Sequence, residues 1–132
     1  MTFKTLAISA AVAVTTLLAL PAHAQFAKSE EAVKYRQGSL FVIGQHFGRI
    51  GAMVNGKLPF DAKAAQENAD IVAAMAALPW TGFGPGTDKG APHKAKPNVW
   101  TEKAKFNEHA QTFQAEAAKL ASAAKTGNLE QI

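Results

Sequence analysis

Regular spacing of apolar residues in three segments is the feature that most restricts how this chain can fold. The series lie within residues 29–54, 61–78 and 98–125, and they advance mainly by three or four residues. Their members are Val33, Leu40, Ile43, Phe47, Ile50 and Val54, then Ala65, Ala69, Val72, Met75 and Leu78, and finally Phe106, Ala110, Phe113, Ala117, Leu120 and Ala124. Such spacing puts the apolar side chains on one helix face, so we predict three amphipathic helices in an all-α, up-and-down bundle.

Residues at the segment ends support these boundaries. Asp61 is expected to cap the second helix, and Pro79 is expected to end it after Leu78. Residues 81–97 contain four glycines and three prolines, so we expect the connection from Trp80 to Pro97 to be irregular.

The end of the chain has the pattern of a helix start. Asn128 is a good N-cap, and Leu129 and Ile132 fall on one helical face. Three amphipathic helices also require a cover for their remaining apolar surface, since each large side chain left in water forgoes about 1.5–3 kcal/mol. We therefore expect a four-helix bundle whose fourth helix is missing from this chain.

Four glycines interrupt the first predicted helix: Gly38, Gly44, Gly48 and Gly51. Each costs about 1 kcal/mol relative to alanine inside a helix. They indicate either close approach of another helix or a flat ligand, or simple tolerance of glycine, and the sequence leaves both open.

Residues 1–24 have the pattern of a secretory signal peptide. Lys4 precedes an uncharged run from Leu6 to Leu20, which is shorter than the roughly 20 residues of a membrane span, and Ala22 to Ala24 form a small-residue cleavage site. We expect one domain over residues 25–132, with no membrane association after cleavage. In an uncleaved chain, residues 6–20 could instead fill the vacant groove.

Charge and cysteine content exclude several classes of function. The net charge of +4 is small, and the basic residues are scattered, so nucleic-acid binding is not expected. The sequence contains no cysteine, which excludes disulfides, thiolate metal sites and thioether-linked cofactors for this chain. No nucleophile–base pair, carboxylate pair or phosphate loop is recognisable, so an enzyme is not predicted.

Four stretches of the sequence resemble cytochrome c′, the class II c-type cytochromes of bacterial periplasms. They are QFAKSEEAVKYRQGSL at 25–40, HFGRI at 46–50, ALPWTGFGPGTD at 77–88 and KPNVWTEKAKF at 96–106. The resemblance spans the chain from residue 25 onward. It implies a periplasmic four-helix bundle, often a homodimer, that carries haem c, binds nitric oxide and carbon monoxide, and exchanges electrons with a redox partner.

This chain departs from the family at the haem attachment. Members hold haem through a Cys-x-x-Cys-His sequence in the fourth helix, and both cysteines and the axial histidine are absent here. Covalent haem attachment is therefore not possible in the chain as given, and we predict no metal ligand within it.

The resemblance nevertheless assigns cofactor-binding roles to residues that are present. It places Leu40 over the open axial face of the haem, and it places Trp80 and Phe83 near the haem edge. Arg36 and Gln37, which share a helix face with Leu40, are expected to bind a haem propionate. From spacing alone, the same three residues would be a core leucine with two solvated neighbours.

The three histidines of the predicted domain match no axial position. His93 lies in the loop and is expected to be solvated, whereas His46 and His109 lie beside the apolar faces of their helices. We interpret them as surface or partly buried residues.

Two functional hypotheses follow. One is a periplasmic cytochrome c′-like haem protein for electron transfer or gas binding, with its covalent haem attachment lost or outside this chain. The alternative is a haem-free helical binding module or a non-functional truncated relic, which the lack of cysteine favours.

Overall fold

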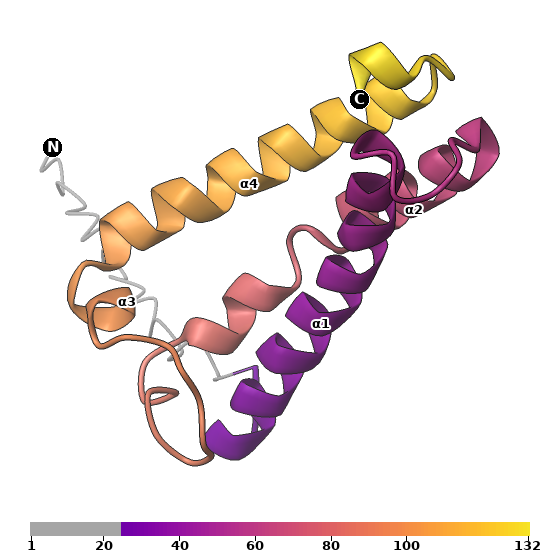
Figure 1. Ribbon diagram of the computed structural model, residues 1–132. Coiled ribbons are helices and arrows are strands. Elements are labelled where there is room, and N and C mark those ends of the chain that lie inside the picture. The colour runs from indigo at the N-terminus through magenta and orange to yellow at the C-terminus, as the bar shows by residue number, and fades with distance from the viewer. Residues whose placement is uncertain (1–24) are drawn as a thin grey trace, which may run out of the picture.

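The computed structural model describes residues 25–132, which form helices joined by turns, with no strand in that range (Figure 1). The predicted signal peptide, and the hypothesis that residues 6–20 fill a groove, lie outside the described residues. In chain order the elements are α1 (Ser29–Val54), α2 (Ala62–Met75), the 3₁₀ helix η1 (Pro79–Phe83), α3 (Asn98–Thr101), α4 (Lys103–Ala124) and the 3₁₀ helix η2 (Leu129–Gln131).

The core forms where α2 packs against both α1 and α4. One cluster joins Ile43 of α1 to Val72 and Ala76 and to Ala117 of α4. A second cluster, nearer the C-terminus, joins the buried residues Ile50, Ala69, Ala121 and Ala124. From this shared end α1 and α4 diverge, and η1, the loop after it and α3 lie at the open end (Figure 1). The predicted helix faces therefore build the core.

Local sequence explains the ends of α2. The Asp61 side chain accepts a hydrogen bond from the backbone N–H of Ala64 at 2.9 Å, which confirms the predicted cap. The helix ends at Met75, three residues before the predicted Leu78. Pro79 lacks an N–H and its ring would clash with the carbonyl four residues earlier, which is that of Met75. The chain continues instead into the tighter η1.

Two further boundaries differ from the prediction. The connection expected to be irregular begins with an ordered 3₁₀ helix, η1. The helix expected over 98–125 is broken at Glu102, which leaves helical geometry at φ −113° and ψ 46° and separates α3 from α4. At the C-terminus the Asn128 side chain accepts from the Glu130 N–H at 2.9 Å, which confirms the predicted cap.

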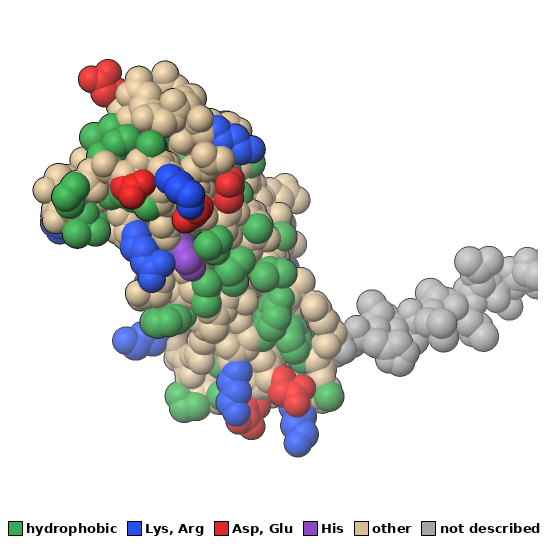
Figure 2. Space-filling view, turned by 90° about the vertical axis from the view of Figure 1, so that its right-hand side faces the viewer, with side chains coloured by type: hydrophobic (Ala, Val, Ile, Leu, Met, Phe, Trp, Pro, Cys, Tyr) green, Lys and Arg blue, Asp and Glu red, His purple; other side chains and the backbone are tan. Residues whose placement is uncertain are grey.

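Part of the α1 apolar series is open to solvent. Leu40, Phe47 and Val54 are 39%, 56% and 46% exposed. Phe47 also lines a small surface cavity together with Phe113 of α4. Figure 2 shows further apolar side chains gathered on one face. The helix α1 therefore retains apolar surface that the described residues do not cover.

The four α1 glycines face open space. A Cβ atom added at any of them would meet no atom within 4 Å, so no described segment approaches the helix closely there. Within residues 25–132, no helix has the length and apolar character needed to cross a membrane.

Close approach does occur at Gly82, in η1. A Cβ atom there would lie 2.8 Å from the Ala32 carbonyl oxygen and 2.8 Å from the Arg36 Cβ. The absence of a side chain therefore lets η1 lie directly against α1.

We predict that Gly82→Ala destabilises the protein by about 1–3 kcal/mol, because η1 must move away from α1 to admit a methyl group. Urea denaturation followed by circular dichroism measures the change. Gly84→Ala is the matched control, since its Cβ would meet nothing within 4 Å. Equal stability of the two variants would contradict the close packing described here.

Candidate functional site

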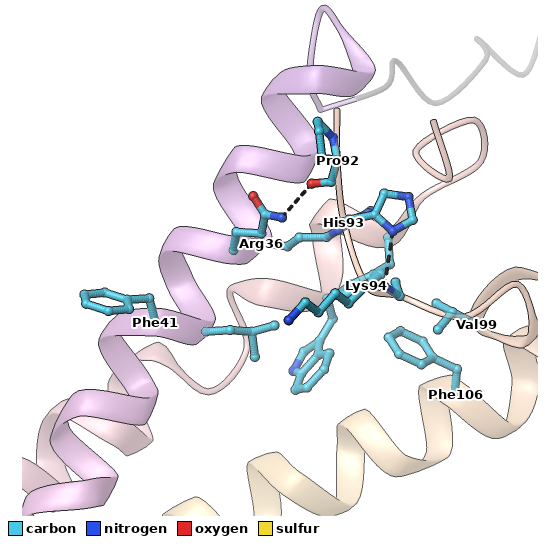
Figure 3. Close-up of a pocket in the computed structure, with 12 residues that line it drawn as sticks. Arg36, Phe41, Pro92, His93, Lys94, Val99 and Phe106 are labelled. Atoms are coloured by element: carbon cyan, nitrogen blue, oxygen red, sulfur yellow. Dashed lines mark hydrogen bonds between the residues drawn. The ribbon is translucent and has the colours of Figure 1, made fainter. Parts of the chain in front are cut away.

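A large cavity of about 970 Å³ opens between α1, η1, α3, α4 and the loop before α3 (Figure 3). This volume lies near the top of the range of about 300–1,000 Å³ typical of small-molecule sites. Its lining residues are Arg36, Gln37, Leu40, Phe41, Trp80, Phe83, Pro92, His93, Lys94, Ala95, Val99 and Phe106. The structure therefore brings all five sequence-predicted site residues to one cavity.

Arg36 is the central polar residue of the site. It is only 2% exposed, and its Nη1 donates to the carbonyl oxygens of Gly82 and Thr87, each at 2.8 Å. Its guanidinium carbon lies 4.5 Å from the ring centre of Phe83 and 5.3 Å from that of Trp100. Cation–π contact and two carbonyl acceptors thus hold the charge in a largely apolar setting.

A hydrogen-bond network supports the guanidinium. The Thr87 hydroxyl donates to the Gly84 carbonyl at 2.7 Å and accepts from Arg36 at 3.3 Å. The Trp100 indole N–H donates to the same carbonyl at 3.1 Å. Sequence reasoning assigned no role to Thr87 or Trp100, because their contacts depend on how the loop and α3 fold against α1.

One nitrogen of the Arg36 guanidinium, Nη2, is buried and has no hydrogen-bond partner among the described residues. Burial also lowers the pKa of the guanidinium below its ordinary value, because removal from water disfavours the charged form. Since arginine stays protonated in proteins, the cavity wall contains a fixed positive charge with donor capacity to spare.

Aromatic rings form the apolar walls. Trp80 lies nearly parallel to Phe83, with centres 6.4 Å apart, and edge-on to Phe106 at 5.9 Å. The Trp80 indole N–H donates to the Ala76 carbonyl at 2.6 Å, so its polar atom is satisfied at the end of α2. The rings present apolar faces that can hold a flat, apolar ligand.

Gln37 and Leu40 complete the α1 side of the cavity. The Gln37 amide donates to the Pro92 carbonyl at 3.0 Å, which ties the loop to the helix. Leu40 is 39% exposed and lines the cavity together with Phe41.

His93 differs from its prediction. It was expected to be solvated, but it is half-buried against Trp100, with ring centres 5.8 Å apart, because the loop folds over the cavity. Its neighbour Lys94 extends along the cavity in the direction of α1 (Figure 3). His46 is half-buried and paired with Asn68 at 2.8 Å, and His109 is exposed, as expected.

Lys103 anchors the far side of the aromatic cluster. Its ammonium donates to the Phe83 carbonyl at 2.7 Å and lies 4.8 Å from the Phe106 ring centre. Burial lowers its pKa below the ordinary lysine value. The complete site therefore combines flat apolar walls with a buried cation, an arrangement suited to a flat ligand that carries a carboxylate.

Comparison with known proteins gives a consistent family relationship. Residues 31–132 match the family described as Cytochrome C′. The chain is 50% identical over 108 residues to cytochrome c′ of Rubrivivax gelatinosus, covering 82% of this chain and 84% of that protein. It is 43% identical over 108 residues to cytochrome c′ of Alcaligenes xylosoxydans, covering 82% and 83%.

Solved structures agree with this relationship. The crystal structure of the Rubrivivax gelatinosus protein superposes with a TM-score of 0.79 at 50% identity, covering 82% of this chain and 84% of that one. A ferrous variant of the Alcaligenes xylosoxidans cytochrome c prime with bound NO gives a TM-score of 0.73 at 42% identity, covering 81% and 82%. These likenesses confirm the predicted fold class.

We predict that Arg36→Met lowers the free energy of unfolding by about 1.5–3 kcal/mol, because the Gly82 and Thr87 carbonyls lose a charged donor. Arg49→Met is the matched control, as the exposed arginine on the same helix, and should change stability by less than about 0.5 kcal/mol. Urea melts compare both with the parent chain. If the Arg36 variant were as stable as the Arg49 variant, the hydrogen bonds from Arg36 to the Gly82 and Thr87 carbonyls would contribute little to the free energy of unfolding.

Proposed function

This chain belongs to the cytochrome c′ family, and on that basis we propose that it binds haem in the cavity beside α1 and serves in electron transfer or in binding diatomic gases. The observation that carries the proposal is a large aromatic cavity lined by the buried cation Arg36, whose Nη2 has no hydrogen-bond partner among the described residues. A haem propionate in the cavity would meet the positive charge of Arg36, and the porphyrin plane would suit the apolar walls.

The residues present have separate roles in this proposal. Arg36 holds a carboxylate and thereby orients the macrocycle, while the second N–H of the Gln37 amide is free to assist. Leu40, Trp80 and Phe83 line the cavity and would shield the macrocycle from water, and Leu40 would restrict access to it. Haem supplies an iron that changes oxidation state and takes ligands such as NO and CO.

Binding must be non-covalent within these 132 residues, since the sequence contains no cysteine. The same fact supports the alternative of a haem-free binding module, and a haem titration separates the two. We further propose export to the periplasm, supported by the signal-like residues 1–24, and association with a redox partner and with a second copy, by analogy with the family. The proposal contains no enzymatic step.

Titration of the purified chain with haemin is expected to give a saturable shift of the Soret band at one equivalent. Arg36→Met should weaken haemin binding about tenfold, because one charged hydrogen bond is lost, whereas Arg49→Met should not. Absence of saturable haemin binding to the folded chain would reject the proposal in favour of a haem-free module.

Two readouts extend this experiment. A denaturing gel stained for haem should show no band at the chain's mass, because detergent releases a non-covalent haem. Carbon monoxide added to the reduced, haem-loaded chain should shift the Soret band, as gas binding requires. A loaded chain whose spectrum does not respond to carbon monoxide would leave electron transfer as the proposed role.

A further inference from the structure

We propose that this cavity recognises a tetrapyrrole by its carboxylates and its flat apolar face rather than by its metal, so that an iron-free porphyrin binds about as well as haem. The inference rests on the proposed function and specifies the ligand class of the same site. Three features of the cavity carry it: the state of its imidazole, the placement of its cations and the nature of its walls.

The lone pair of the His93 imidazole, which lines the cavity, is already occupied by a hydrogen bond. His93 Nε2 lies 2.9 Å from the Asp88 carbonyl oxygen, which can only accept, so Nε2 carries the proton. The other nitrogen, Nδ1, accepts a hydrogen bond from the Ala95 backbone N–H at 3.2 Å. Both ring nitrogens therefore form hydrogen bonds with the backbone of the loop. Binding of a metal ion by either nitrogen would require one of these hydrogen bonds to break.

Two cationic side chains, Arg36 and Lys94, line the cavity and could bind the carboxylates of a ligand. Arg36 keeps its positive charge there, and its buried Nη2 has no hydrogen-bond partner among the described residues. Lys94 extends from the loop along the cavity toward α1 (Figure 3) and makes no ion pair with a described residue. Two cations at one cavity match the two carboxylates of a natural porphyrin such as protoporphyrin.

The walls recognise shape and apolar area. Leu40, Trp80, Phe106 and Val99 contribute apolar surface, and burial of a large planar ring against them is favourable whether or not the ring contains iron. The twelve residues that line the cavity can therefore bind a ligand through charge, hydrogen bonds and burial of apolar surface. None of these interactions requires a metal in the ligand.

The experiment compares three ligands on the same purified chain: haemin, protoporphyrin IX and protoporphyrin IX dimethyl ester. Quenching of Trp80 and Trp100, the two tryptophans of the chain, reports binding, since both adjoin the site. We expect haemin and protoporphyrin IX to bind with dissociation constants within about threefold of each other, and the ester at least about tenfold more weakly, because it lacks the charged acceptors. The ester arm requires no variant and so does not depend on folding of a mutant.

Two variants sharpen the result. Arg36→Met should weaken haemin and protoporphyrin IX equally, with Arg49→Met as control and circular dichroism to verify folding. His93→Ala should leave the ratio of the two dissociation constants unchanged. Haemin binding at least about tenfold tighter than protoporphyrin IX, or a selective loss of haemin affinity in His93→Ala, would overturn the inference while leaving the haem proposal intact. Failure of haemin itself to bind would instead reject the proposed function.

Discussion

The buried guanidinium of Arg36 is the interaction on which the site depends. It joins the N-terminal third of α1 to η1 and to the turn after η1, through carbonyl groups 46 and 51 residues away in the sequence. A charge with so little contact with water is tolerated only when it is well paired, and here two backbone acceptors and two aromatic rings provide the pairing. This contact helps to position the loop after η1 and the aromatic rings that line the cavity.

The arrangement is possible because Gly82 carries no side chain. Its backbone lies so close to α1 that its carbonyl oxygen comes within 2.8 Å of the Arg36 side chain. Pro79 contributes earlier in the chain, since it ends α2 and turns the backbone into η1. A short run of residues, ALPWTGF, thus ends one helix, places two aromatic rings and supplies an acceptor for the buried cation.

The same contacts leave a ligand site rather than a filled core. Arginine holds the loop through Nη1 only, so Nη2 keeps its donor capacity. The helices α1 and α4 diverge toward this end of the molecule (Figure 1), and Leu40 of α1 and Phe106 of α4 both line the cavity. An apolar cavity strengthens any hydrogen bond made to the guanidinium, because the local dielectric constant is low. The structure therefore favours a ligand that is both flat and anionic.

The sequence by itself determined where the helices lie, to within a few residues, and part of their buried faces, since spacings of three and four residues and the caps at Asp61 and Asn128 act locally. It also identified Arg36, Gln37, Leu40, Trp80 and Phe83, although only through family resemblance, because spacing alone made Arg36 a solvated neighbour of a core leucine. The burial of Arg36, the half-buried His93 and the role of Trp100 were decided by the tertiary structure. Each depends on how the loop folds between distant helices, and such long-range contacts leave no periodic signal in the sequence.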